Sequence, residues 1–163
     1  MSVPANYQLC FSGYGRRVWI ANSVVEAWHS QRQTSADDPE DFGVLIGTTS
    51  EDRRERWIDF ITRPMDADKQ SRFNFELMDP GHQQAVDGAF DSSSGTKIYL
   101  GTWHTHPESV PQPSGVDIAD WNRCIGRNRN RPLVFVIVGI EQTCLFLPWG
   151  CLFKSLIPSE ELR

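Results

Sequence analysis

Two short, unbroken apolar runs constrain the fold more than any other feature of this sequence. Residues 42–50 read FGVLIGTTS and residues 132–140 read PLVFVIVGI, and each run has the length of a single strand. A strand without polar alternation is buried on both of its faces, so other elements must cover the sheet that contains it. The sequence therefore predicts a layered protein in which helices pack against a central sheet.

Three amphipathic segments separate the predicted strands. Apolar side chains recur at helical spacing over residues 22–31, 79–90 and 114–126, and Gly126 is expected to end the third helix. Strand-like runs lie before, between and after these segments, in the order β-α-β-β-α-β-α-β-β. The expected fold class is α/β (α+β), a mixed sheet flanked by about three helices, in a single domain over residues 1–163.

Composition and charge exclude several classes of protein. No apolar run approaches the roughly 20 residues that cross a bilayer. The N-terminus lacks the basic start and continuous apolar core of a secretion signal. The formal net charge of −5 argues against general nucleic-acid binding, which requires a basic surface. We therefore expect a cytoplasmic protein with neither a membrane nor a nucleic acid as partner.

Neither the cysteines nor the one basic cluster indicates a separate active site. The cysteines form no C-x-x-C pair and are expected to be free, largely buried thiols in a reducing compartment. They are Cys10, Cys124, Cys144 and Cys151. Arginines gather at the end of the third predicted helix, where cations complement the helix dipole. A solvated helix end explains this cluster better than a docking patch for an acidic partner. The cluster consists of Arg123, Arg127, Arg129 and Arg131.

The candidate chemistry is concentrated in residues 101–121, which read GTWHTHPESVPQPSGVDIADW. Residues two apart in a strand point to the same side, so His104 and His106 can present two imidazoles to one point. Zinc binds imidazole nitrogens and commonly takes a carboxylate as a further protein ligand. The H-x-H pair alone is weak evidence, because many such pairs are exposed strand residues. His29 and His82 lie alone in predicted helices and are interpreted as surface residues.

Spacing alone leaves the third ligand and the general base open. Asp117 follows the second histidine by eleven residues, enough for a loop to return its carboxylate, and Glu108 and Asp120 compete with it. The segment SGVD also has the form of a capping box, in which Ser114 and Asp117 stabilise a helix start; the two roles are compatible. Hydrolysis at a metal needs a base as well, and the acidic loop DDPED at residues 37–41 offers four carboxylates.

The whole stretch resembles the JAMM motif of the JAB/MPN-domain metalloproteases. That motif is H-x-H-P, a serine after seven intervening residues, and x-x-Asp. In this chain its positions are His104, His106, Ser114 and Asp117. Family members also carry an upstream glutamate in the pattern E-x-x-G-apolar-apolar-x-G, and the segment EDFGVLIG places it at Glu40. Together the two motifs are specific, whereas H-x-H alone is not.

The resemblance extends beyond the motifs. The order of predicted elements is similar to the JAB/MPN fold over about residues 15–155, which is the expected core of the domain. One departure is that many members have two adjacent glycines where this chain has Phe42 and Gly43. We interpret it as a change at a packing position that leaves the ligand set untouched.

The resemblance implies a Zn²⁺-dependent isopeptidase or peptidase. His104, His106 and Asp117 would bind the metal, Glu40 would act as general base, and Ser114 would donate a hydrogen bond to the developing oxyanion. Family members typically cut the bond after the C-terminal glycine of ubiquitin or a ubiquitin-like protein. Such an extended tail is expected to bind by adding to an exposed sheet edge near the metal.

The compact chain also resembles small stand-alone bacterial JAB proteins. Some are deconjugases encoded beside a fused ubiquitin-type activating and conjugating enzyme and a cGAS-like nucleotidyltransferase in CBASS antiphage operons. That resemblance implies, as partner, a ubiquitin-like protein or a conjugated target such as the nucleotidyltransferase. Two alternatives stay open: a non-catalytic MPN-type scaffold, and a metal-dependent amidase for another substrate. All five motif positions are filled, which favours catalysis.

Overall fold

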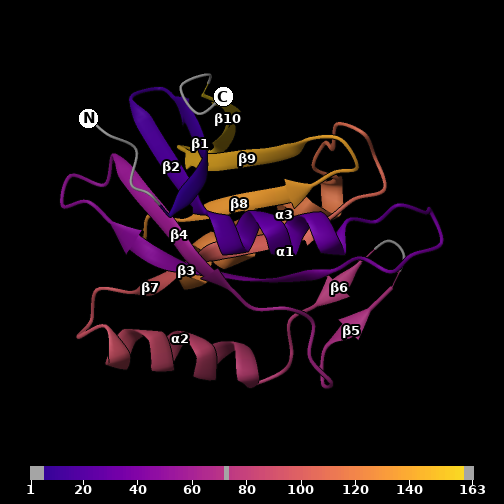
Figure 1. The fold of residues 1–163 in the computed structure, drawn as a ribbon, viewed down its shortest axis with the longest axis horizontal. Helices are drawn as coiled ribbons and strands as arrows, with labels where there is room; N and C mark the ends of the chain where they lie inside the picture. The colour runs from indigo at the N-terminus through magenta and orange to yellow at the C-terminus, as the bar shows by residue number, and fades with distance from the viewer. Residues whose placement is uncertain (1–5, 72–73, 160–163) are drawn as a thin grey trace.

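The centre of the structure is a sheet of eight strands that closes on itself (Figure 1). The computed structural model describes residues 6–71 and 74–159. In chain order the strands of this sheet are β1 (Tyr7–Gly13), β2 (Arg16–Ala21), β3 (Phe42–Thr49), β4 (Glu55–Ile61), β7 (Ile98–Thr105), β8 (Val134–Val138), β9 (Thr143–Trp149) and β10 (Leu152–Pro158). Around the sheet they follow the order β1-β10-β9-β8-β7-β3-β4-β2.

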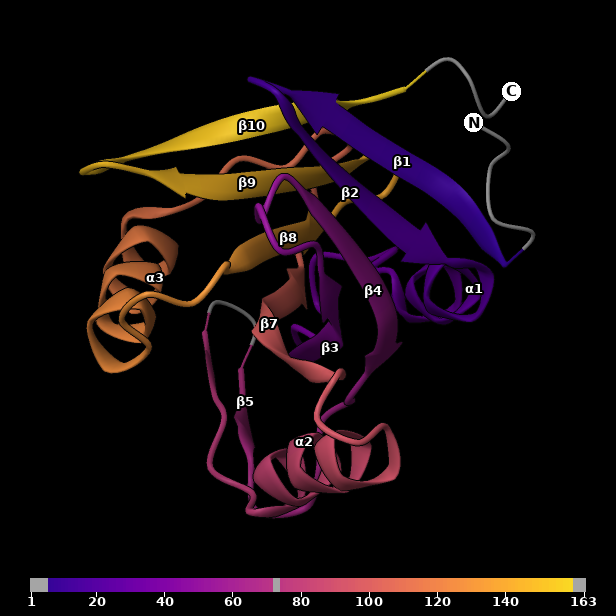
Figure 2. The ribbon, with the colours of Figure 1, turned by 90° about the vertical axis from the view of Figure 1, so that its left-hand side faces the viewer.

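Three helices and a small hairpin lie outside this sheet in the described part of the chain (Figures 1 and 2). The helices are α1 (Asn22–Gln31), α2 (Gly81–Ser92) and α3 (Gly115–Arg127), and the hairpin pairs β5 (Lys69–Gln70) with β6 (Phe75–Glu76). None of these helices has the length and hydrophobicity to cross a membrane. The predicted α/β (α+β) class, a mixed sheet with about three helices, is confirmed.

The two apolar runs form the strands on either side of β7. β3 pairs with β7 in the antiparallel direction, and β8 pairs with it in parallel. All five residues of β8 are buried, as expected for a strand covered on both faces. The end of β7 is therefore held between two strands whose positions the core fixes.

Two apolar clusters anchor the helices. Val24, Val25 and Trp28 of α1 belong to the larger cluster, which also contains Trp103 of β7. Trp121 of α3 belongs to the second cluster and stacks on Phe135 of β8, with ring centroids 4.9 Å apart. This second contact fixes α3 beside the end of β7.

Several elements differ from the expectation. β1 was not predicted, although its pairing with β10 closes the sheet. The β5–β6 hairpin was not predicted either, because two-residue strands have no measurable periodicity. α3 continues through Gly126 to Arg127, and Asn128 is its C-cap, so the prediction that Gly126 ends the helix is wrong.

A buried histidine joins α2 to the sheet. His82 is only 5% exposed, so the prediction that it lies at the surface is wrong. Its Nδ1 lies 2.6 Å from Thr62 Oγ1, and its Nε2 lies 2.6 Å from Asp68 Oδ2. Burial by itself raises the pKa of Asp68, but hydrogen bonds from the Asp79 N–H and from His82 outweigh burial and hold that pKa below its usual value.

His82→Ala is expected to lower the free energy of unfolding by about 2–3 kcal/mol, because buried polar atoms lose their partner. Part of this stabilisation requires Asp68 to be ionised. That part is complete above the usual pKa of aspartate and is lost as the pH falls through the lowered pKa of Asp68. Urea unfolding at several pH values measures it. His29→Ala is the matched control, because His29 is exposed on α1 and its loss should cost less than about 0.5 kcal/mol. Equal losses in the two variants would contradict the role of His82.

Candidate metal centre

β7 carries both motif histidines to its C-terminal end. His104 lies in the strand, where it pairs with Phe42 of β3 and Ile137 of β8. His106 follows the strand, and its N–H donates to the carbonyl of Val138 at 3.0 Å. Both histidines are buried, and their Nε2 atoms lie 3.1 Å apart. The two imidazoles thus point to one place, as the spacing predicts.

The start of α3 brings a carboxylate to the same place. Ser114 and Asp117 form the capping box: the Asp117 N–H donates to Ser114 Oγ at 3.1 Å, and the Ser114 N–H donates to Asp117 Oδ2 at 2.7 Å. Asp117 Oδ1 lies 3.1 Å from His104 Nε2, and Oδ2 lies 3.3 Å from His106 Nε2. The cap therefore holds the carboxylate against both imidazoles, so one residue stabilises the helix start and faces the histidines.

The donor set fits a divalent metal such as zinc. His104, His106 and Asp117 each offer one ligand atom within 4.8 Å of the others, and all three are buried. In a tetrahedral zinc site with bonds of about 2.0–2.1 Å, neighbouring ligand atoms lie about 3.3 Å apart. The two Nε2 atoms lie 3.1 Å apart, close to that value, and each lies 3.1–3.3 Å from a different oxygen of Asp117. Two imidazoles and one carboxylate are also ligands that zinc commonly takes.

At His104 and Asp117 the electrostatics favour the protonation states that a metal requires. Burial lowers the pKa of His104, which keeps its imidazole neutral. Burial alone raises the pKa of Asp117, but hydrogen bonds to His104 and His106 outweigh burial and move that pKa well below its usual range. A neutral imidazole and an ionised carboxylate are the forms that bind metal. His106 differs: burial lowers its pKa, but the hydrogen bond to Asp117 and the negative charges around it outweigh burial and raise that pKa, so metal binding must displace a proton there.

The competing carboxylates lie elsewhere. Glu108 Oε1 is 3.1 Å from Nδ1 of His106, the ring nitrogen that does not face Asp117. Asp120 forms an ion pair with Arg123 on the surface of α3. Of the three carboxylates that spacing left open, Asp117 faces both Nε2 atoms.

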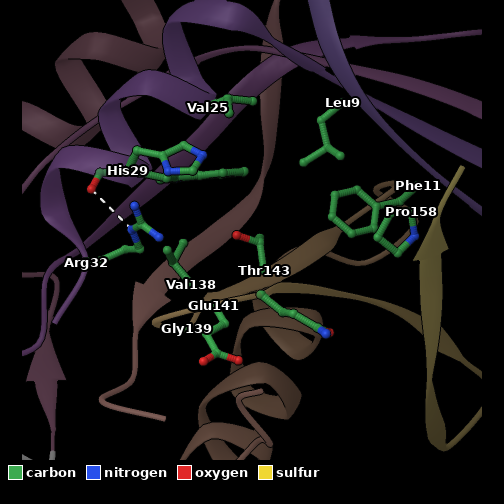
Figure 3. A pocket seen from close by; sticks show the side chains of 12 residues that line it. Leu9, Phe11, Val25, His29, Arg32, Val138, Gly139, Glu141, Thr143 and Pro158 are labelled. Carbon is green, nitrogen blue, oxygen red and sulfur yellow. Dashed lines mark hydrogen bonds between the residues drawn. The ribbon is translucent and has the colours of Figure 1, made fainter. Parts of the chain in front are cut away.

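The backbone of Glu108 is anchored to the connection between β8 and β9. The Ile140 N–H donates to the Glu108 carbonyl at 2.8 Å, and the Ile140 carbonyl accepts from Arg32 Nη1 at 2.7 Å. Figure 3 shows Arg32 at the end of α1, where its Nε donates to the His29 carbonyl at 3.3 Å. Arg32 lines a cavity of about 470 Å³ that contains none of the metal-facing side chains. The turn after His106 is thus connected to α1.

Glu40 lies at the edge of the centre, just before β3. It is 5% exposed, and its Oε1 is 4.0 Å from Nε2 of His106. Burial raises the pKa of Glu40 to about 7, against the opposing effect of His106. Of its neighbours in the acidic loop, Asp38 accepts from the Ser35 N–H and Asp41 accepts from Gln70. Glu40 is therefore the carboxylate of this loop that approaches the histidines.

The β5–β6 hairpin supports the centre from one side. Phe75 of β6 stacks on Phe42 with ring centroids 4.5 Å apart, and it also contacts the His104 ring at 5.2 Å. Gln70 of β5 donates to the Glu40 carbonyl at 2.9 Å. Sequence reasoning missed Gln70 and Phe75, because nothing in the local pattern around them indicates a hairpin.

Comparison with known proteins agrees with this geometry. The model of one protein family, described as prokaryotic homologs of the JAB domain, matches residues 22–149. The chain belongs to the prokaryotic JAB family. This JAB domain is also similar to the solution structure of a Desulfitobacterium hafniense protein, with a TM-score of 0.56 and 21% identity, over 83% of this chain and 87% of that chain. At that identity the likeness shows a shared fold alone.

Three bacterial relatives of this JAB domain carry the name CD-NTase/cGAS isopeptidase. The Pseudomonas aeruginosa protein is 39% identical over 121 residues, which cover 74% of this chain and 75% of the relative. The Escherichia coli protein is 38% identical over 128 residues, covering 77% of this chain and 78% of the relative. The Vibrio cholerae protein is 38% identical over 121 residues, covering 73% and 75%.

Proposed function

We propose that this JAB protein is a Zn²⁺-dependent isopeptidase of the JAMM type. The observation that carries the proposal is the convergence of His104, His106 and Asp117, with Glu40 beside them. The names of the three relatives, CD-NTase/cGAS isopeptidase, support the reaction class. When bound by these three side chains, zinc supplies a Lewis acid that acidifies water and polarises a carbonyl.

Two side chains carry out the proton transfer and the charge stabilisation in this proposal. Glu40 takes a proton from the attacking water and then gives it to the departing amine. In the metal-free protein burial raises the pKa of Glu40 to about 7, and a cation bound by the neighbouring side chains would lower it, which favours the carboxylate that accepts the proton. Ser114 is exposed next to Asp117, and its hydroxyl donates to the oxygen of the substrate carbonyl as negative charge develops there.

The proposed substrate is the bond that follows the C-terminus of a ubiquitin-like protein or of a similar conjugated tail. By analogy with the names of the relatives, the protein that carries this C-terminal tail is a cGAS-like nucleotidyltransferase. The setting that goes with this proposal is cytoplasmic antiphage defence. The eight-stranded sheet is closed and offers no free edge to an extended tail. We therefore propose that the tail adds to a strand of the β5–β6 hairpin. That hairpin lies beside His104 and Glu40.

A conjugate assay tests the proposed function. The purified protein is incubated with a nucleotidyltransferase whose C-terminal glycine is joined to a lysine of a carrier protein, and cleavage is followed by electrophoresis. We expect cleavage that phenanthroline abolishes and added zinc restores, whereas N-ethylmaleimide leaves the rate unchanged, because no cysteine takes part. Full activity after exhaustive chelation contradicts the metal mechanism. Binding of the conjugate without cleavage supports a scaffold instead.

Glu108→Ala is expected to weaken zinc binding by about tenfold, because a carboxylate on the second ring nitrogen orients a metal-binding histidine. Glu108→Gln keeps an acceptor for Nδ1 and should weaken zinc binding less. Competition with a chromophoric chelator measures the affinity without reference to turnover. Glu141→Ala is the control, since Glu141 is exposed in the β8–β9 connection and has no contact with the histidines. An unchanged affinity in Glu108→Ala contradicts this role.

A further inference from the structure

Two adjoining cavities, which together we call the α3 groove, lie along α3 between the metal centre and the end of that helix. The first part of the groove has a volume of about 360 Å³, lies between α3 and the β6 segment, and includes Asp117 in its lining. Its second part has a volume of about 490 Å³ and lies between α2 and the end of α3. Figure 2 shows the hairpin, marked by β5, between α3 and α2. The two parts share the lining residues Leu77, Tyr99 and Arg127.

The far end of the groove is basic. Arg127 and Arg131 line it, both are exposed, and neither has a carboxylate partner among residues 6–71 and 74–159. Arg123, nearer the metal centre, is paired with Asp120. Among the residues that the structure describes, the only carboxylate that lines the second part is Asp87, which accepts a hydrogen bond from Gln83. In a chain with a net charge of −5, two unpaired guanidinium groups leave a positive charge at this end that an acidic partner would complement.

The groove suits a polypeptide better than a small ion. Apolar side chains form much of the wall of the second part and can cover the side chains of an extended segment. They are Leu77, Val86, Phe90 and Ile98. In an isopeptide conjugate, the side before the cleaved bond is an extended tail, whereas the other side is a lysine of a folded target. The groove therefore fits the tail that precedes the bond.

The distance along α3 from Asp117 to Arg127 determines which residue of a bound tail lies beside the arginines. From Asp117 to Arg127 the helix advances by about 15 Å, at about 1.5 Å per residue. An extended chain covers that distance in about five residues, at about 3.3 Å per residue.

We propose that Arg127 and Arg131 bind an acidic side chain that lies about five residues before the cleaved bond. The guanidinium groups and the carboxylate form charge-assisted hydrogen bonds at the far end of the groove. This preference rests on the proposed function, and it adds a charge requirement on the substrate. The arginines are specificity-determining residues that take no part in the chemistry.

A glutamate scan of the tail tests the preference. Ten-residue peptides ending in glycine are joined to the Nε of a fluorescent lysine, and one glutamate is placed in turn at positions two to eight before the bond. We expect kcat/KM to peak, about five- to tenfold above the neutral peptide, with glutamate four to six residues before the bond. The double variant Arg127→Glu, Arg131→Glu should lose this peak and should prefer lysine at the same position. Arg129→Glu is the matched control, because Arg129 is exposed in the same cluster and does not line the groove.

A binding assay separates this preference from the proposed function. The same peptides are titrated into a Glu40→Gln variant and followed by fluorescence anisotropy at low and high salt. Glutamate-dependent binding that weakens at high salt supports the role of the arginines, even where no peptide is cleaved. Absence of chelator-sensitive cleavage would then contradict the proposed function alone. A flat scan in both assays, or an equal loss in Arg129→Glu, overturns the role of Arg127 and Arg131.

Discussion

Glu40→Gln is expected to lower kcat for the isopeptide bond about a thousandfold while the zinc content stays at one ion per chain. Glutamine has the size of glutamate but accepts no proton from water, and general base catalysis is typically worth about 10²–10⁴-fold in rate. Steady-state assays of the conjugate, together with metal analysis of the purified variant, measure the two quantities. The rate should fall because proton transfer is lost, since Glu40 is not among the three converging ligands.

The control for this variant is Asp41→Asn. Asp41 adjoins Glu40, and its backbone is hydrogen-bonded to Thr105, but its side chain accepts from Gln70 and forms no ion pair with either histidine. Its replacement should therefore change kcat by only a few fold. Loss of zinc from Glu40→Gln would show that Glu40 binds the metal and that the base lies elsewhere.

The metal-free protein offers a second measurement on Glu40. Because burial raises the pKa of Glu40 to about 7, the folded state holds a proton that the unfolded chain releases at lower pH. The stability of the metal-free protein should therefore fall as the pH rises from the usual glutamate pKa to about 7. Glu40→Gln should remove this part of the pH dependence and raise Tm above pH 7.

Phe42→Ala is expected to lower the free energy of unfolding by about 3–5 kcal/mol, because the ring of Phe42 is completely buried and its loss leaves a large cavity. Its stack on Phe75 also holds β6 against the His104 ring, so zinc affinity should fall in the same variant. Urea unfolding gives the stability, and chelator competition gives the affinity.

Phe60→Ala is the matched control for Phe42. Phe60 lies in β4 and is 54% exposed, so its replacement should cost no more than about 1 kcal/mol. A loss below 1 kcal/mol in Phe42→Ala would show that the neighbouring strands collapse into the space. Phe42, where many family members have a glycine, thus occupies a packing position, and the Phe75 ring lies between it and the ring of His104.

The convergence of His104, His106 and Asp117 could be predicted from the sequence, because it depends on the geometry of one strand and one helix start. Alternation along β7 turns His104 and His106 to the same side, and the capping box fixes Asp117. Glu40 is different. It reaches the centre because Phe42 of β3 pairs with His104 of β7, and no local pattern states that register. The family resemblance supplied Glu40 where spacing left four candidates.

The β5–β6 hairpin and the burial of His82 could not be predicted from the sequence, because both depend on residues that are distant along the chain. The β5–β6 hairpin is too short for periodicity, and it is held by the Phe75 stack and by Gln70. His82 is buried because Thr62 and Asp68 meet it from 20 and 14 residues earlier in the chain. A lone histidine in a helix gives no sign of such partners, so a surface position was the natural expectation.

The pairing of β1 with β10 leaves neither strand as a free edge of the eight-stranded sheet. Phe11 lies opposite Pro158, and Ser12 lies opposite Ile157, so the first and last strands cover each other's outer backbone groups. Unpaired strands of this length are templates on which other chains polymerise. Trimming either strand would expose such an edge, and we expect self-association of the trimmed protein as a result.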